Sequence, residues 1–211
     1  MSNYEKPDFW SLRAQKEGYP ARSVYKLQEI DKKFGLLPAR PAQINADFRV
    51  LELGAAPGSW SLYVLRKFSG RGFLAACDLS PLSHRPDSGL FGGQNFFFKQ
   101  ADIFVAETRA ELTALGPFSL ILSDAAPATS GGRLVDAARQ AELAEAAFLY
   151  AHAALKRGGN VCVKIFQGAD TTDLIKEIRP LFNTLKTFKP KACRSSSLET
   201  YLVGVGFKTL S

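Results

Sequence analysis

Residues 50–61 read Val50-Leu51-Glu52-Leu53-Gly54-Ala55-Ala56-Pro57-Gly58-Ser59-Trp60-Ser61 and take the chain from one kind of element to another. The apolar, β-prone run 48–53 predicts a buried strand. The chain then turns through two glycines and a proline, and the apolar residues of 59–68 recur at helical spacing. A strand, a glycine turn and a helix form the unit with which α/β proteins hold a nucleotide-like ligand at a strand's carboxyl end.

The turn itself narrows the choice of ligand. Its spacing is not G-x-G-x-x-G, which disfavours a dinucleotide, and it lacks the Gly-Lys-Ser/Thr of a phosphate-binding loop. Glu52 at the end of the strand, followed by a G-x-x-P-G turn, suits a ligand that carries both an ammonium and a carboxylate. S-adenosylmethionine is such a ligand. The alternative interpretation is an ordinary tight turn between a strand and a helix.

Length and composition favour one globular domain over residues 1–211, with a basic segment, 1–47, before a catalytic sheet, 48–211. No apolar run approaches the roughly 20 residues that span a bilayer, and the N-terminus has no apolar core of a secretory signal. Three scattered cysteines and two histidines predict a reduced, cytoplasmic protein without a metal site. The net charge of +7 favours a polyanionic partner such as nucleic acid, although many basic proteins use charge only for solubility.

Strand-like and helix-like segments alternate along the chain until a closing hairpin-like pair of strands. This pattern predicts an α/β fold with a doubly wound, mostly parallel sheet, one antiparallel edge strand and helices on both faces. Strands are expected at 48–53, 73–77, 95–98, 118–123, 160–166, 184–188 and 200–207, and helices at 21–34, 59–68, 106–115, 133–156 and 170–182.

Acidic residues follow the early strands at positions that suit a nucleoside. Asp78 ends the second strand, about 20 residues beyond the glycine turn, where α/β proteins hold a pair of ribose hydroxyls. Asp102 follows the third strand and is placed to reach an adenine amino group. Asp124 ends the fourth strand, where the simplest interpretation is a turn acid.

Three further charged residues have equally plain interpretations when each is taken alone. Lys164 interrupts the apolar run 160–166, and on an edge strand it would extend into solvent. Lys26 would be a helix-surface charge, and Glu199 a charge in the loop before the last strand. On a wound sheet, however, the strand-end positions point toward the crevice that contains Gly54, which favours a common site.

Several dispersed segments together resemble the FtsJ family of RNA ribose 2′-O-methyltransferases. The segments are RSVYKLQEID, LGAAPGSWS, CDLSP, SDAAP, VKIF and SLETYLV, and the resemblance runs from about Phe9 to Gly206 in the family's order. It implies a Rossmann-like sheet of seven strands, RNA as methyl acceptor, and a catalytic tetrad of Lys26, Asp124, Lys164 and Glu199. It also implies S-adenosylmethionine as methyl donor, held by Gly54, Gly58, Trp60, Asp78, Asp102 and Asp124.

The segment Asp124-Ala-Ala-Pro127 departs from the Asp-Met-Ala-Pro or Asp-Met-Ser-Pro commoner in that family, and Glu52 stands where aspartate is frequent. We expect these changes to alter the pocket wall and not the chemistry.

The chemistry of methyl transfer to a hydroxyl leaves two roles for Lys164. The attacking hydroxyl must lose its proton as the new bond forms, and a lysine accepts a proton only when it is neutral. Burial and a neighbouring ammonium lower a lysine pKa, whereas carboxylates raise it. Lys164 is therefore expected to be the general base or the cation that stabilises the developing oxyanion. Lys26 would assist electrostatically and help hold RNA, and the two carboxylates would orient the lysines.

Phosphate contacts are expected from basic residues of the N-terminal segment and of the loop before the last strand. These are Arg13, Lys16, Arg22, Lys189, Lys191 and Arg194. Phe9, Trp10 and Tyr19 are candidates for stacking a flipped base. Lys32 and Lys33 are interpreted as solvated surface charges.

Compact members of the resembled family imply large-subunit ribosomal RNA as substrate, with a uridine 2′-hydroxyl presented by structured RNA or by the ribosomal subunit. We expect the enzyme to act as a monomer. The alternatives are a transfer-RNA 2′-O-methyltransferase, a non-catalytic RNA-binding protein on the same fold, and a methyltransferase acting on a small molecule or a protein.

Overall fold

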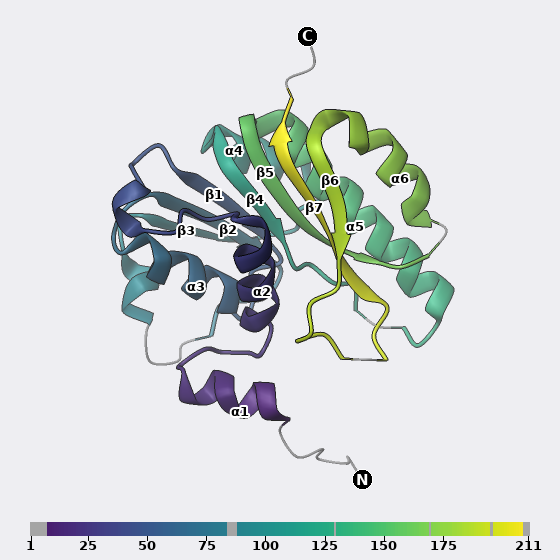
Figure 1. Ribbon diagram of the computed structural model, residues 1–211, viewed down its shortest axis with the longest axis horizontal. Coiled ribbons are helices and arrows are strands. Elements are labelled where there is room, and N and C mark those ends of the chain that lie inside the picture. Colours follow the sequence, from purple (N-terminus) through teal and green to yellow (C-terminus); the bar gives the residue numbers. More distant parts are fainter. Residues whose placement is uncertain (1–7, 84–87, 129, 169, 195, 209–211) are drawn as a thin grey trace.

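The computed structural model describes residues 8–83, 88–128, 130–168, 170–194 and 196–208. Its centre is a seven-stranded sheet in the order β3-β2-β1-β4-β5-β7-β6. The strands are β1 (Arg49–Leu53), β2 (Phe73–Asp78), β3 (Phe96–Gln100), β4 (Phe118–Ser123), β5 (Leu155–Phe166), β6 (Phe182–Phe188) and β7 (Glu199–Phe207). Helices cover both faces (Figure 1).

The fold predicted from the sequence is confirmed. All neighbouring strands are parallel except at β7, which is antiparallel to both β5 and β6. The antiparallel strand belongs to the edge hairpin and lies second from the edge, with β6 outermost. The strand order reverses direction between β1 and β4, and in open α/β sheets ligands bind outside the carboxyl ends of strands at such a point.

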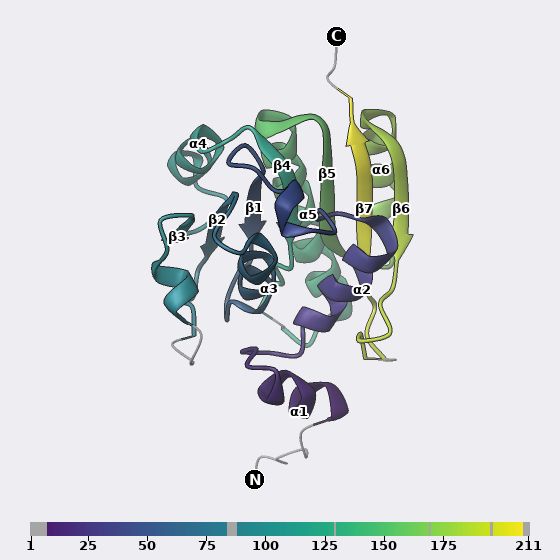
Figure 2. The same cartoon turned by 60° about the vertical axis from the view of Figure 1, so that its left-hand side comes forward.

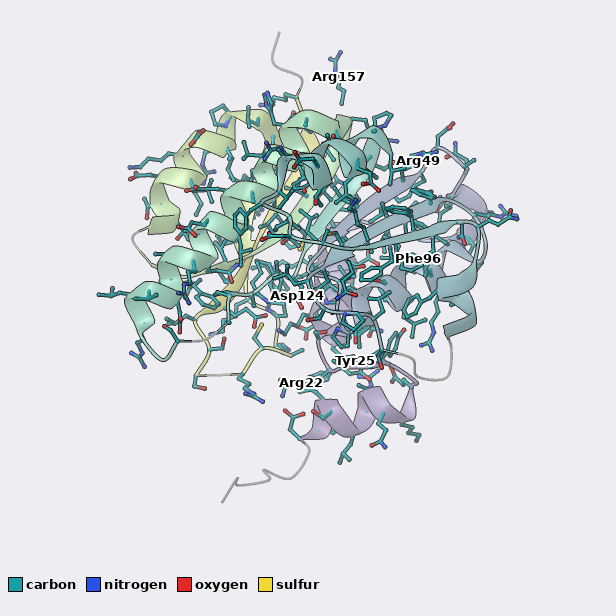
Figure 3. The ribbon with its side chains drawn as sticks, turned by 180° about the vertical axis from the view of Figure 1, so that it is seen from behind. Arg22, Tyr25, Arg49, Phe96, Asp124 and Arg157 are labelled. Atoms are coloured by element: carbon teal, nitrogen blue, oxygen red, sulfur yellow. The ribbon has the colours of Figure 1, made fainter. Side chains whose placement is uncertain are left out.

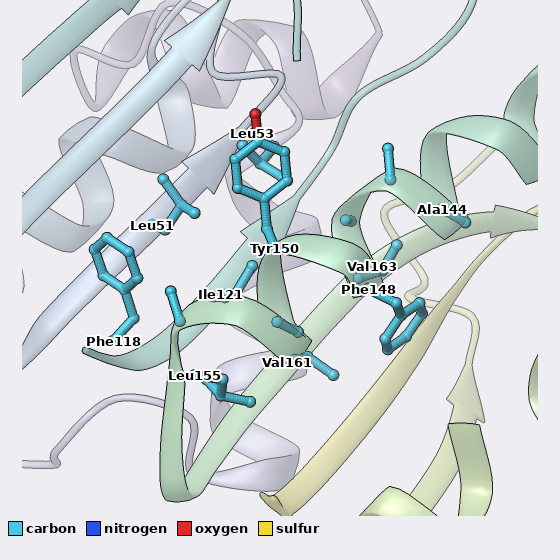
Figure 4. Packing of buried hydrophobic residues seen from close by; sticks show 14 of the residues in the cluster. Leu51, Leu53, Phe118, Ile121, Ala144, Phe148, Tyr150, Leu155, Val161 and Val163 are labelled. Atoms are coloured by element: carbon cyan, nitrogen blue, oxygen red, sulfur yellow. The ribbon is translucent and has the colours of Figure 1, made fainter. Parts of the chain in front are cut away.

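The helices form a layer on each side of the sheet (Figure 2). One apolar cluster joins the sheet to α4 (Ala106–Ala114), α5 (Arg133–Ala154) and α6 (Asp170–Ile178). Figure 4 shows its centre, where Tyr150 and Phe148 of α5 lie over strand residues such as Ile121 and Val163. A second cluster joins the other face to α2 (Val24–Phe34) and α3 (Ser59–Phe68).

The segment before the sheet adds α1 (Phe9–Lys16), which begins with Asp8 as its N-cap, and α2, which ends at Gly35 in the left-handed conformation. Leu27 and Ile30 of α2 are wholly buried against the sheet side, as their spacing predicts. A small third cluster, which includes Ala14 and Tyr25, connects α1 to α2 and α3. The N-terminal helices are therefore part of the packed structure and hold Lys26 at a fixed place.

The helix α1 was not predicted from the sequence, and the other differences lie mostly at element ends. β5 begins at Leu155 instead of 160, across an irregular register with β4. The helix expected to reach 182 ends at Ile178 and continues as a short 3₁₀ turn, Arg179–Leu181. Phe182 starts β6 because its ring packs against Phe207 and Phe148, and this packing prevails over the helical pattern. Two more 3₁₀ turns, Pro41–Gln43 and Ser88–Gly92, lie in predicted loops.

Candidate active site

The glycine turn after β1 lies directly against the turn after β4. Gly54 has φ +76°, and a Cβ at this position would be 2.4 Å from the backbone N and Cα of Ala125. The Asp124 amide also donates to the Leu53 carbonyl oxygen at 3.1 Å. Only glycine permits both the left-handed backbone and this close approach. The turn therefore brings the ends of β1 and β4, and Asp124 with them, to one point.

A cleft opens beside this turn and contains three of the residues predicted to bind cofactor, Gly54, Asp78 and Asp102. Its other walls are Leu79, Ala101, Ile103, Phe104, Ala125, Ala126 and Leu143. The Asp78 carboxylate accepts hydrogen bonds from the amides of Ala56 and Ser80, and that of Asp102 accepts one from Phe104. These backbone bonds fix the two carboxylates in place, and each oxygen keeps a further lone pair for a ligand.

Trp60 has a different environment from the one its motif suggests. Its side chain is 2% exposed, its indole N–H donates to the Ser23 carbonyl oxygen at 2.8 Å, and its ring packs on Tyr201. The side chain therefore fastens α3 to the start of α2 and does not line the cleft. Gly58, which precedes α3, is in the left-handed region at φ +104°. Only the backbone atoms of Trp60 and Gly58 are therefore candidates for contact with the cofactor, and these contacts stay predictions.

The four residues of the predicted tetrad meet on the α2 side of the sheet. Lys26 Nζ lies 2.6 Å from Oε1 of Glu199, and Lys164 Nζ lies 3.0 Å from Oδ1 of Asp124. Lys164 also donates to the Asp124 carbonyl oxygen at 2.6 Å. The side chains of both lysines are largely buried. Lys164 is thus on an interior strand and inside the protein, which excludes the interpretation of an edge lysine extending into solvent. Figure 3 places Asp124 near the centre of the molecule.

Tyr201, which the sequence reasoning did not single out, joins the two ion pairs. Its hydroxyl oxygen is 2.7 Å from Oδ1 of Asp124 and 2.6 Å from Oε1 of Glu199. Tyr201 also lies directly opposite Lys164 in the pairing of β5 with β7. The signal was present, because residues two apart on a strand share a face and Tyr201 is two residues beyond Glu199.

The surroundings of Asp124 and Lys26 favour the charged form of each side chain. Burial alone would raise the pKa of Asp124, but the charges of Lys164 and Lys26 and a hydrogen bond from Tyr201 outweigh it, so the pKa is lowered. Burial would lower the pKa of Lys26, but the carboxylates of Asp124 and Glu199 outweigh it, so this pKa is raised. Lys26 is accordingly an ammonium at neutral pH.

Glu52, predicted to face a ligand ammonium, lies fully inside the protein. Its Oε2 accepts a hydrogen bond from the Ser61 hydroxyl at 2.6 Å, and its buried Oε1 has no partner among the described residues. Burial raises the pKa of Glu52 to about 8; the Ser61 hydrogen bond opposes this and the charges of Asp124 and Asp78 add to it. The residue lies beneath the glycine turn, and its contact with a ligand stays a prediction.

The basic residues predicted to bind RNA divide into two groups. Arg22 and Arg194 line a pocket with Lys26 and Glu199, whose other walls are Ala21, Ser23, Ala192, Ser196 and Ser197. Arg22 also ties two segments together, because its guanidinium donates to the Ala192 carbonyl oxygen and pairs with Asp8. This pocket leads from the surface to the tetrad.

The second group lies outside that pocket. Lys16, Lys189 and Lys191 are exposed, with Lys189 Nζ donating to the Ser197 carbonyl oxygen. Arg13 pairs with Glu17 and lies over the Tyr25 ring. Contact of Arg13, Lys16, Lys189 and Lys191 with RNA phosphate stays a prediction.

Of the three aromatic residues proposed to stack a base, two remain available. Phe9 is 69% exposed and Trp10 is partly exposed. Tyr19 is buried, and the Arg66 guanidinium covers its ring at 4.3 Å from the centroid. The stacking role predicted for Tyr19 is therefore wrong, because both packing and a cation already occupy that ring.

Two features are absent from the described residues. Within the described ranges, no helix combines the length and apolar character that crossing a membrane requires. In the same part of the chain, no three or more histidine, cysteine, aspartate or glutamate side chains are grouped as ligands for a metal ion. The three cysteines are free and buried.

A seven-stranded sheet of this order, with an acid-lined cleft at its switch point, defines the class of Rossmann-like methyltransferases. Known structures agree: a Plasmodium falciparum protein whose crystal structure was described as that of a ribosomal RNA methyltransferase superposes with a TM-score of 0.72 at 26% identity, over 91% of this chain and 100% of that one. Human methyltransferase-like protein 13, in complex with SAH, shares the fold alone, with a TM-score of 0.60 at 15% identity over 89% and 84% of the chains.

The model of the FtsJ-like methyltransferase family matches residues 19–207, and the chain belongs to that family. Curated relatives cover nearly the whole chain. The "Ribosomal RNA large subunit methyltransferase E" of Treponema denticola is 47% identical over 98% of both chains. The protein of the same name from Oleidesulfovibrio alaskensis is 43% identical over 96% of this chain and 93% of its own length. The predicted family and the assignment as a methyltransferase enzyme are confirmed.

Proposed function

We propose that this enzyme transfers a methyl group from S-adenosylmethionine to a ribose 2′-hydroxyl of large-subunit ribosomal RNA, at a uridine. The observation that carries the proposal is the pair of buried ion pairs, Lys26–Glu199 and Lys164–Asp124, at the edge of the sheet where β4 and β5 end and beside the cleft. A protein that only bound RNA would need neither the buried lysines nor the cleft. The names of the curated relatives support ribosomal RNA as the acceptor.

The cleft fits the proposed methyl donor in its chemistry. Asp78 and Asp102 supply acceptors for ribose hydroxyls and an adenine amino group, and Ile103, Phe104 and Leu143 supply apolar surface for a base. When bound, S-adenosylmethionine supplies a methyl group on a sulfonium, which makes that carbon electrophilic. The residues of this chain have only to position the acceptor oxygen and handle its proton and charge.

Lys26 and Lys164 are the groups that would meet the acceptor oxygen. Two of the three N–H donors of the Lys164 ammonium are engaged by Asp124, which leaves one for the substrate hydroxyl. As the carbon–oxygen bond forms and the carbon–sulfur bond breaks, the hydroxyl proton must leave. Lys26, held as an ammonium, stabilises the negative charge that develops on the oxygen.

Lys164 has two chemically distinct ways to assist. A neutral Lys164 takes the proton, and Asp124 then holds its ammonium in place. A charged Lys164 instead stabilises the oxyanion together with Lys26, and the proton passes to water. Substitution of Lys164 by arginine, which keeps the charge but cannot give up its proton at neutral pH, separates these two roles.

RNA suits the entrance to the tetrad better than a small molecule or a protein does. The pocket that leads to Lys26 and Glu199 is lined by Arg22, Arg194 and hydroxyl-bearing serines. Cations and hydroxyls are the groups that most often bind phosphate oxygens. The basic surface is modest, so presentation of one nucleotide by folded ribosomal RNA or by the large subunit is part of the proposal.

The deciding experiment follows methyl transfer from labelled donor into RNA, protein and small-molecule fractions, with Lys164→Ala as control. With the wild type, label is expected in the RNA fraction only. With Lys164→Ala, no label is expected in any fraction. Mapping 2′-O-methyl sites in RNA from cells with and without the gene then identifies the nucleotide. A site lost from transfer RNA, with ribosomal RNA unchanged, would replace the substrate but keep the chemistry. Label in protein alone would overturn the proposal.

A further inference from the structure

A second hollow, of about 550 Å³, lies outside the cleft and the tetrad. We call it the α2 groove. It runs between α1, the outer side of α2 and the end of β6, and three rings form its apolar surface: Trp10, Tyr25 and Phe188. The centroids of Trp10 and Tyr25 are 5.1 Å apart. Tyr25 is buried and Trp10 is partly exposed, so the tyrosine supports the indole from below. The volume is in the range of sites that bind one small ligand or nucleotide.

Cations line the same groove. Arg13, Lys32, Lys33 and Lys191 contribute to its wall. Lys33 Nζ lies 4.1 Å from the Phe188 ring centroid and the Arg13 guanidinium lies 4.6 Å from that of Tyr25, so cations and rings alternate. The side chains of Lys32, Lys33 and Lys191 are exposed, and none has an acidic partner among the described residues.

The one acid in the wall, Glu29, is already engaged. Its two carboxylate oxygens accept hydrogen bonds from the backbone amides of Lys191 and Ala192, at 2.8 and 2.9 Å. These amides occupy both oxygens of the carboxylate, and the four cations in the wall outnumber this one acid, so the groove keeps a positive balance. Alternating rings and cations are the features with which proteins bind unpaired nucleic acid, because every base has a face to stack and every phosphate a charge.

The α2 groove is also continuous with the path to the tetrad. The turn at Lys191 and Ala192 lies between the α2 groove and the pocket that leads to the tetrad. Arg22 donates a hydrogen bond to it, and Glu29 accepts two hydrogen bonds from its amides. Lys26 and Lys33 are seven residues apart on the same helix, about 10 Å along its axis. An RNA strand that leaves the tetrad along α2 therefore meets the groove within its next nucleotides.

We propose that the α2 groove binds a nucleotide flanking the target, with its base stacked on Trp10 and its phosphates facing Lys32, Lys33 and Lys191. Lys32 and Lys33, which the sequence analysis interpreted as solvated surface charges, thus form part of the substrate site together with Lys191, which was predicted to contact phosphate. This inference rests on the proposed function, since the strand in the groove is the same RNA that the enzyme modifies.

The test measures binding of the full chain to a labelled single-stranded oligouridylate by fluorescence anisotropy. Trp10→Ala should weaken binding about tenfold, as expected for one lost stacked base, whereas Trp10→Phe should keep most of the affinity. Lys32→Glu combined with Lys33→Glu should weaken binding and lower the slope of log affinity against log salt by about 1.4. Lys176→Glu on α6 is the matched control, since Lys176 is equally exposed to solvent but lies on the other face of the sheet, and it should change nothing.

A direct signal comes from the indole. Bound oligouridylate should quench tryptophan fluorescence of the wild type and not of Trp10→Phe, whose remaining Trp60 is buried. Unchanged affinity and salt slope in all groove variants, with methyl transfer to RNA intact, would overturn the inference alone. Normal binding of naked RNA with lost binding of the large subunit would instead make the groove a protein-docking surface, which also overturns it. If the wild type binds and is quenched but methylates no RNA, the proposed function fails and the groove stands.

Discussion

The hydroxyl oxygen of Tyr201 lies 2.7 Å from Oδ1 of Asp124, and the same oxygen lies 2.6 Å from Oε1 of Glu199. One phenol therefore separates the carboxylates of two ion pairs. It has a single proton to donate, so the second carboxylate must rely on its lysine for compensation. Burial and the two carboxylates raise the pKa of Tyr201 well above its ordinary value, which keeps that proton in place. The hydroxyl thus couples the positions of Lys26 and Lys164.

Tyr201→Phe should slow methyl transfer about tenfold in single-turnover experiments, because it removes a hydrogen bond to a charged group but keeps the ring that packs on Trp60. Affinity for the methyl donor should stay the same. Tyr63→Phe is the matched control, since its hydroxyl also donates to a carboxylate, that of Asp31, at 2.7 Å outside the tetrad. The control should lose stability and keep its rate. Equal rates for Tyr201→Phe and wild type would mean that the hydroxyl does not position the lysines.

Lys164→Ala should reduce the single-turnover rate by two to four orders of magnitude, the range roughly expected for loss of a general base. Donor affinity should change little because Lys164 is not among the residues that line the cleft. Lys164→Arg separates the two roles, since arginine keeps the charge but cannot give up its proton at neutral pH. A variant with arginine that retains much of the rate would identify Lys164 as the oxyanion-stabilising cation. An arginine variant as slow as the alanine variant, together with a wild-type rate that rises with pH, would identify Lys164 as the general base.

The resemblance to a family implied the tetrad, and the sheet explains why three of its members meet: Asp124 follows β4, Lys164 lies near the end of β5, and Glu199 begins the antiparallel β7 beside β5. Lys164, Asp124 and Glu199 needed only the sheet order to meet. The two-residue spacing places Tyr201 on the face of Glu199, but its contact with Asp124 and the role of Trp60 depend on packing between elements that are distant in sequence. Trp60 shares a motif with the cofactor turn, but its indole is used to hold Ser23.

Arg22 and Lys191 also show that sequence patterns do not reveal contacts between residues that are distant in the chain. The sequence analysis predicted that Arg22 and Lys191 contact phosphate; Arg22 lines the pocket that leads to the tetrad, and Lys191 lines the α2 groove. That Arg22 also fixes the backbone of Ala192 depends on a contact across 170 positions of the chain, which no local pattern contains. The α2 groove was missed for the same reason, since α1, α2 and the end of β6 contribute its walls.

Asp78→Asn and Asp102→Asn should each weaken binding of S-adenosylmethionine, measured by calorimetry. Loss of a charged acceptor for a ribose hydroxyl or an adenine amino group is worth on the order of 1.5–3 kcal/mol, about tenfold or more in affinity. Asparagine at 102 keeps an oxygen for the Phe104 amide, whereas asparagine at 78 keeps only one of the two oxygens that the Ala56 and Ser80 amides use, so the melting temperature of the Asp78 variant is measured as well. Asp173→Asn, at an exposed residue of α6, is the control. If both cleft variants bind the donor as the wild type does, the donor occupies another site.

Glu52 makes the stability of the native protein depend on pH in a direction that can be worked out. Its pKa is about 8 in the folded protein against an ordinary value of 4.5. Between these values the folded state retains a proton that the unfolded state has lost, so the unfolding free energy contributed by this group falls as pH rises, by up to roughly 1.4 kcal/mol per pH unit. Below the lower value and above the higher one, the contribution is constant.

Glu52→Gln should remove this dependence, because glutamine resembles the protonated acid and still accepts the hydrogen bond from Ser61. The unfolding free energy of the variant minus that of the wild type, from chemical denaturation, should therefore be larger at about pH 8 than at about pH 5. Other titrating groups are common to both proteins and cancel in the difference. Glu177→Gln, at an exposed residue of α6, should give the same difference at both pH values. Parallel stability curves for wild type and Glu52→Gln would mean that Glu52 is ionised in the native state, and its unpartnered Oε1 would then need a cation that the described residues do not supply.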